Sequence, residues 1–144
     1  MARRGTSVIV VDSSVVLSLL FDEPESPLAR RIFMQAAADD GAVAPPLQIY
    51  EILNACSRAL VSQRLEPAEF DLVLGAFEFL RVRTLESPTI AATRRIAALA
   101  AMHNLSAYDA AYLESAISLR CGLATFDRRL RAAAEAVGVP LASG

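Results

Sequence analysis

Three aspartates stand where a carboxylate could take part in chemistry. Asp12 directly follows the β-branched run 8–11, which is typical of a buried strand. Asp127 comes two residues after Thr125 at the end of another predicted strand, and Asp109 falls in the first turn of a predicted helix. In open α/β sheets, ligands gather at the carboxyl ends of the strands. If the three segments meet there, their carboxylates form one acidic site.

Each aspartate also has a simpler interpretation as a helix cap. Asp12 and Asp127 each precede a predicted helix, and Ser106 with Asp109 three residues later resembles a capping box. Asp109 fits this interpretation less well because its helix is apolar almost all round. A carboxylate within apolar packing must be hydrogen-bonded, paired or metal-bound, and the sequence contains no lysine to pair with it.

Glu51 is the fourth acid of interest, on a helix predicted over about 47–63. The apolar residues of this helix form one predicted stripe: Ile49, Ile52, Leu53, Cys56 and Leu60. Glu51 lies on the other face, which predicts a solvated glutamate. That face is not plainly polar, however, since Leu47, Tyr50 and Asn54 share it. A role for Glu51 in the site therefore stays open.

A cluster of these four acids would require a cation. Two carboxylates about 4 Å apart repel each other by ~4 kcal/mol at an effective dielectric constant near 20. Oxygen ligands without imidazole or thiolate select Mg²⁺ or Mn²⁺ rather than zinc, and His103, the single histidine, has no partner at metal-ligand spacing. A divalent ion with open water positions suits phosphodiester hydrolysis. We therefore hypothesise a Mg²⁺ site, with Mn²⁺ as a substitute.

The overall charge does not indicate a general nucleic-acid-binding protein. The net charge is −2 and the pI is about 5.4, and all 14 basic residues are arginine. An acidic chain can still bind a polyanion locally if a metal and nearby guanidinium groups reverse the field. Arg128, Arg129 and Arg131, just beyond Asp127, are the candidates for such contacts. A solvated helix face explains these three arginines equally well.

Length and composition predict a single domain over residues 1–144. Cys56 and Cys121 are not at metal-ligand spacing and suit a reduced cytosol. The basic start 1–4 followed by an apolar run resembles a signal peptide, but Asp12 interrupts that run. No segment approaches the ~20 apolar residues of a membrane span. We therefore expect a cytoplasmic protein without a membrane anchor.

Short predicted strands alternate with longer predicted helices. The strands are expected at 8–11, 42–44, 82–85 and 123–125, with a strand or strand-like tail at 137–140. The helices are expected at 13–21, 28–38, 47–63, 67–79, 88–103, 107–120 and 127–136. No pair of strands is joined by a tight hairpin turn. The pattern predicts an α/β domain with a central parallel sheet of four to five short strands, flanked by helices on both faces.

Taken in order, four segments resemble the PIN domain family, and more narrowly the VapC-type toxins of toxin–antitoxin pairs. They are residues 10–14, Glu51 with Asn54, residues 108–113 and residues 123–130. The resemblance implies that Asp12, Glu51, Asp109 and Asp127 bind Mg²⁺ and position water for attack on RNA. It implies that Ser13, Thr125 and Asn54 are accessory polar groups. It also implies a homodimer and a cognate antitoxin protein.

Other interpretations of the acids fit the sequence less well or remain as alternatives. A phosphoacceptor receiver module usually needs a lysine, which is absent, and a haloacid-dehalogenase-type phosphatase needs an aspartate where Ser14 stands. A non-catalytic PIN-like scaffold that binds a partner protein is one alternative. An RNA-processing nuclease that has no antitoxin is the other.

Overall fold

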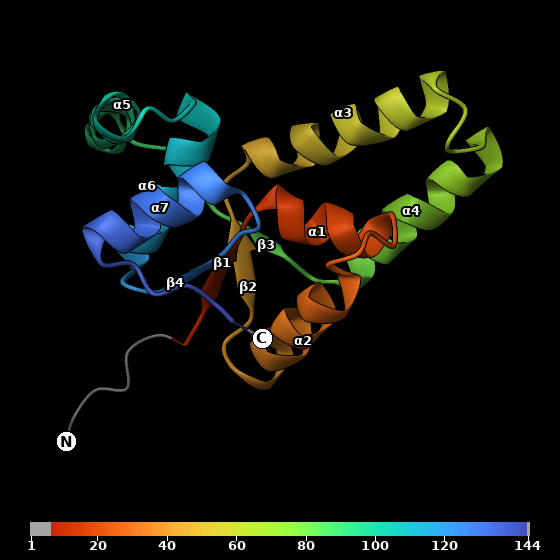
Figure 1. Ribbon diagram of the computed structural model, residues 1–144, viewed down its shortest axis with the longest axis horizontal. Helices are drawn as coiled ribbons and strands as arrows, with labels where there is room; N and C mark the ends of the chain where they lie inside the picture. Colours follow the sequence, from red (N-terminus) through yellow and green to blue (C-terminus); the bar gives the residue numbers. More distant parts are fainter. Residues whose placement is uncertain (1–6, 144) are drawn as a thin grey trace.

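Four short parallel strands form the sheet in the computed structural model, which describes residues 7–143 (Figure 1). They are β1 (Ile9–Val11), β2 (Ala42–Ala44), β3 (Arg83–Thr84) and β4 (Gly122–Ala124), in the spatial order β3-β2-β1-β4. The predicted α/β class and parallel sheet are confirmed. The expected tail strand is reduced to one isolated bridge between Leu123 and Leu141. The basic stretch 1–4 lies outside the described residues.

β1 lies inside the sheet because both of its faces are apolar. Val10 pairs with Val43 of β2 on one side and with Leu123 of β4 on the other. Its side chain belongs to the core on one face of the sheet, whereas Val11 belongs to the core on the opposite face. Both valines are fully buried. A strand covered on both faces requires such an uninterrupted apolar run, and this run fixes where Asp12 emerges.

Helices cover both faces of the sheet (Figure 1). One face packs against α1 (Ser13–Leu20), α2 (Ser26–Ala38), α3 (Leu47–Val61) and α4 (Pro67–Phe79). The other face packs against α6 (Ala107–Leu119) and α7 (Arg128–Val137), and α5 (Ile90–His103) packs on α6. Within residues 7–143, none of these helices is long and apolar enough to cross a membrane.

α3 buries a different stripe from the one its apolar residues predict. Ile49 and Leu53 are 47% and 37% exposed, so the predicted stripe is wrong at both positions. The buried residues of α3 are Gln48, Ile52, Cys56 and Ala59. The Gln48 amide donates a hydrogen bond of 2.7 Å to the carbonyl oxygen of Val11, which compensates for the burial of the amide. This orientation places Glu51 beside the buried face.

Candidate active site

Asp12 is held at the carboxyl end of β1 by two hydroxyl groups. Its side chain is 5% exposed. Ser14 Oγ and Thr125 Oγ1 both donate to Asp12 Oδ2, at 2.7 and 2.8 Å. Burial raises the pKa of the Asp12 carboxyl, and these two hydrogen bonds act in the opposite direction. Asp12 occupies the N-cap position of α1 without a side-chain capping hydrogen bond, and its side-chain partners are the two hydroxyl groups.

Glu51 is half-buried and hydrogen-bonded, so the prediction of a fully solvated glutamate is wrong. Ser13 Oγ donates to Glu51 Oε1 at 2.9 Å, and Tyr112 Oη donates to the same oxygen at 2.6 Å. The pKa of Glu51 is raised, first by burial and then by the negative charges of Asp12 and Asp109, whereas the two hydroxyl groups lower it. The carboxylate thus lies within the electrostatic reach of two other acids.

Asp109 is half-buried in the first turn of α6. Its backbone N–H donates to Ser106 Oγ at 3.1 Å, so the predicted capping interaction is present. The carboxyl group has a raised pKa because of burial and, after that, because of the charges of Asp12 and Asp127. Capping therefore accounts for the backbone of this turn, while the carboxylate participates in the acidic cluster.

Asp127 caps α7 and also joins this cluster. Its Oδ1 accepts a hydrogen bond of 2.8 Å from the backbone N–H of Leu130, which confirms the capping interpretation. Its own backbone N–H donates to Thr125 Oγ1 at 3.1 Å, and Thr125 in turn donates to Asp12. The residue is exposed. Its carboxylate is therefore the most accessible of the four acids and the one best placed to meet a ligand arriving from solvent.

The four acids come from four separate elements and influence one another electrostatically. The charge of Asp12 raises the pKa of both Glu51 and Asp109, and the charge of Asp127 raises that of Asp109. Among residues 7–143, no three carboxylate, thiol or imidazole side chains are close enough together to bind one metal ion. The donor set itself consists of oxygen atoms, which suits a hard divalent cation.

Three supporting residues were not identified as part of the site from sequence. The hydroxyl of Ser14 donates a hydrogen bond to Asp12 and accepts one from the backbone N–H of Phe126 at 3.0 Å. Tyr112 and Gln48 reach the site from helices that are distant in sequence. The sequence signal that could identify them is a polar side chain on an otherwise apolar helix face, because such a side chain needs a hydrogen-bond partner when it is buried.

The predicted accessory and RNA-binding residues lie in different environments. Asn54 is exposed on α3, and Arg128 and Arg129 are exposed in the first turn of α7. Arg131 is half-buried, and its NH1 donates to the carbonyl oxygen of Thr125 at 3.0 Å. Arg128 and Arg129 can therefore extend toward a ligand near Asp127, whereas Arg131 is hydrogen-bonded to the backbone of Thr125.

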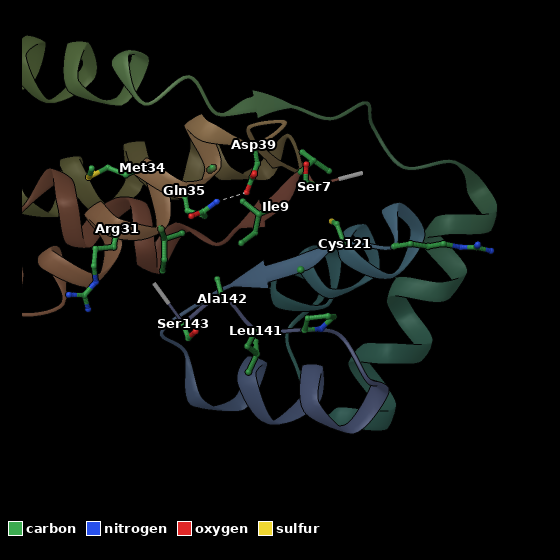
Figure 2. A pocket seen from close by; sticks show the side chains of 16 residues that line it. Ser7, Ile9, Arg31, Met34, Gln35, Asp39, Cys121, Leu141, Ala142 and Ser143 are labelled. Atoms are coloured by element: carbon green, nitrogen blue, oxygen red, sulfur yellow. Dashed lines mark hydrogen bonds between the residues drawn. The ribbon is translucent and has the colours of Figure 1, made fainter. Parts of the chain in front are cut away.

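A large cavity lies at the other edge of the sheet, away from the acids. It measures about 910 Å³, and its wall includes Ile9 and Gly122, the first residues of β1 and β4. Figure 2 shows Met34, Cys121 and Leu141 around it, with no member of the acidic cluster. Because the strands are parallel, this is their amino-terminal edge. This cavity therefore lies at the opposite edge of the sheet from the acids and does not mark the acidic site.

The raised carboxyl pKa of Asp12 predicts how stability depends on pH. The folded protein takes up a proton at higher pH than the unfolded chain, whose aspartate has its ordinary value of 3.8. This group therefore destabilises the fold at neutral pH, and the destabilisation disappears as the pH falls through the raised value. In EDTA, we expect Asp12→Asn to unfold at a higher temperature than wild type at neutral pH, with the difference vanishing near pH ~4. A difference that does not change with pH would contradict this.

The comparisons with known proteins identify the family of the chain. A model of the PIN domain matches residues 9–136. A VapC ribonuclease of Mycobacterium bovis and ribonuclease VapC9 of Mycobacterium tuberculosis are each 32% identical to the chain over 123 residues, which cover 85% of this chain and 88% of the relative.

Two solved structures resemble the whole fold. PAE2754 from Pyrobaculum aerophilum has a TM-score of 0.71 and 23% identity, covering 96% of this chain and 88% of its own. FitAcB from Neisseria gonorrhoeae has a TM-score of 0.51 and 20% identity, with coverages of 92% and 95%. Identities this low bear on the fold alone. The family match and the mycobacterial relatives go further: the chain belongs to the PIN domain family, in which the curated relatives that it matches are VapC ribonucleases.

Proposed function

We propose that this protein is a Mg²⁺-dependent endoribonuclease that acts as the toxin of a toxin–antitoxin pair. The observation that carries the proposal is the electrostatic influence that the acids exert on one another: the charge of Asp12 raises the pKa of Glu51 and Asp109, and the charge of Asp127 raises that of Asp109. The names of the mycobacterial relatives support RNA as the substrate. They also favour a toxin over a general RNA-processing nuclease.

The four acids fit a divalent metal by their chemistry. Each offers carboxylate oxygen, and repulsion between them favours a cation that neutralises it. Both hydroxyl donors to Asp12 bind its Oδ2, so neither Ser14 nor Thr125 engages the other oxygen. A bound Mg²⁺ or Mn²⁺ would activate water and neutralise charge on the phosphate. Asp12 would be the central ligand because its position is the most constrained.

The residues of the chain that contact RNA lie beside Asp127 in this proposal. The exposed guanidinium groups of Arg128 and Arg129 would bind phosphate oxygens, a contact for which arginine has the right geometry. The net charge of −2 favours such a local contact over a broad basic surface. Arg131 would support this segment through its hydrogen bond to Thr125 rather than contact RNA.

The partners proposed are a cognate antitoxin and a second copy of the chain. The antitoxin follows from the resemblance to VapC-type toxins, which the names of the mycobacterial relatives support. Exposed apolar side chains on α4, among them Leu72 and Phe79 at 73% and 83% exposure, are available for an interface between two copies. Light scattering distinguishes a homodimer from a monomer.

Cleavage of RNA by the purified protein tests the proposal. We expect cleavage in Mg²⁺, loss in EDTA, and recovery when Mg²⁺ or Mn²⁺ is added back, because in this mechanism the metal activates water and neutralises charge on the phosphate. Undiminished cleavage in EDTA would overturn the metal-dependent mechanism. No cleavage with either metal would favour the non-catalytic scaffold.

Expression in a bacterial host separates the toxin from an RNA-processing nuclease. We expect growth arrest that is relieved by co-expression of a small protein encoded next to this one. An active nuclease that leaves growth unaffected would support the alternative without an antitoxin.

A further inference from the structure

We infer that Tyr112 is a positioning residue that fixes the Glu51 carboxylate for metal binding through its hydroxyl group. The inference rests on the proposed function, because it concerns the same acidic site. Tyr112 Oη donates to Glu51 Oε1 at 2.6 Å, and Ser13 Oγ donates to that same oxygen at 2.9 Å. The two hydroxyl oxygens are themselves 2.8 Å apart. The two hydroxyl oxygens and Glu51 Oε1 thus form a triangle at one side of the carboxylate.

The triangle joins the three elements that carry Asp12, Glu51 and Asp109. Ser13 is the first residue of α1 and adjoins Asp12, Glu51 lies on α3, and Tyr112 lies one turn after Asp109 on α6. Gln48, one turn before Glu51, is bonded to the carbonyl oxygen of Val11 just before Asp12. α3 is therefore hydrogen-bonded on both sides of Asp12, to Val11 at the end of β1 and to Ser13 at the start of α1. A shift of Glu51 would disturb both.

Burial makes the tyrosine hydroxyl a constrained donor. Tyr112 is 0% exposed, and a buried phenol needs a hydrogen-bond partner. Within the described chain, the side-chain hydrogen-bond partners of its hydroxyl are Ser13 and Glu51. Hydrogen bonds to a carboxylate are shorter and stronger than those between neutral groups. Tyr112 and Ser13 together restrain the rotation of Glu51 about its terminal bond.

The two hydroxyl groups bind one oxygen of Glu51 and so determine which oxygen is available to a metal. Both hydroxyl groups bind Oε1, so Oε2 is the Glu51 oxygen that they leave for a cation. Partners of this kind set the orientation of metal ligands, and their removal typically weakens metal affinity or activity by about 10–100-fold. Phenylalanine at position 112 keeps the ring and its packing but removes the donor. The effect of the hydroxyl can therefore be separated from that of the ring.

The test is Mn²⁺ binding, measured by calorimetry without RNA, on wild type, Tyr112→Phe and Ser13→Ala. We expect each variant to bind Mn²⁺ on the order of tenfold more weakly than wild type. The matched control is Tyr108→Phe, the same change on the same helix at a residue that is 65% exposed, which should bind as wild type does. In RNA cleavage at a fixed metal concentration, Tyr112→Phe should lower kcat and leave KM for RNA unchanged.

The outcomes separate the inference from a purely structural role and from the proposed function. A structural role alone predicts a lower unfolding temperature for Tyr112→Phe with wild-type Mn²⁺ affinity, and that result overturns the inference. If Tyr112→Phe does not fold, Ser13→Ala decides by the same criterion, because it acts on the same oxygen of Glu51. Wild-type protein that binds no Mn²⁺ would overturn the proposed metal site itself.

Discussion

Asp12→Asn should reduce RNA cleavage in Mg²⁺ at least about a hundredfold, because a metal ion contributes several kcal/mol and each 1.36 kcal/mol is a factor of ten in rate. Asparagine has almost the same shape, and its carbonyl oxygen can still accept the hydrogen bonds that Ser14 and Thr125 donate to the aspartate. The loss would therefore come from the missing charge rather than from a displaced side chain. Initial rates on a defined RNA measure it.

The control for this substitution is a carboxylate outside the cluster. Asp71 is exposed on α4, so Asp71→Asn removes the same charge from the surface. This variant should cleave RNA at the wild-type rate. Equal losses in the two variants would mean that net charge, and not the position of Asp12, controls activity.

Ile52→Ala should lower the free energy of unfolding by about 2–5 kcal/mol, the usual cost of truncating a large side chain in a packed core. Ile52 is 1% exposed and belongs to the core between the sheet and the helices on the α1 side. It follows Glu51 directly, so its packing also sets the rotation of α3 that brings Glu51 to the site. Chemical denaturation of the metal-free protein measures the change.

Ile49→Ala is the matched control for that measurement. It is the same substitution on the same helix, at a residue that is 47% exposed. A residue this accessible leaves a much smaller cavity, so the change in unfolding free energy should be clearly smaller than for Ile52→Ala. A loss at Ile49 as large as that at Ile52 would show that α3 has the orientation that its apolar residues predict.

The sheet and three of the acids were predictable because their signals are local. The β-branched run that ends at Asp12 and the short strand that ends before Thr125 each identify a strand without reference to the rest of the chain. Asp109 was predictable because a carboxylate on an apolar helix requires a partner. Helix capping explains only part of the role of Asp127. Its side chain caps α7, and its backbone N–H donates to Thr125, which in turn donates to Asp12.

The apolar stripe of α3 does not show that Glu51 lies beside the buried face, because hydrophobicity alone does not decide which side of this helix is buried. The buried residues include Gln48, a polar side chain whose amide donates a hydrogen bond to the carbonyl oxygen of Val11, 37 residues earlier in the sequence. A helical wheel counts such a glutamine as polar and the exposed Ile49 as core. The contact between Glu51 and Tyr112 spans 61 residues, so no local pattern could reveal it. Tertiary packing, rather than periodicity, brings the fourth acid to the site.

RNA cleavage by wild type and Asp12→Asn, each measured side by side in Mg²⁺ and in EDTA, decides whether Asp12 acts through a metal. The proposed mechanism predicts cleavage in one condition, wild type with Mg²⁺, because both the carboxylate of Asp12 and the metal are required. A contaminating ribonuclease would be present in both preparations and would cleave with either protein. Cleavage by Asp12→Asn in Mg²⁺ at the wild-type rate, or by wild type in EDTA, would contradict the proposal that Asp12 acts through a bound metal.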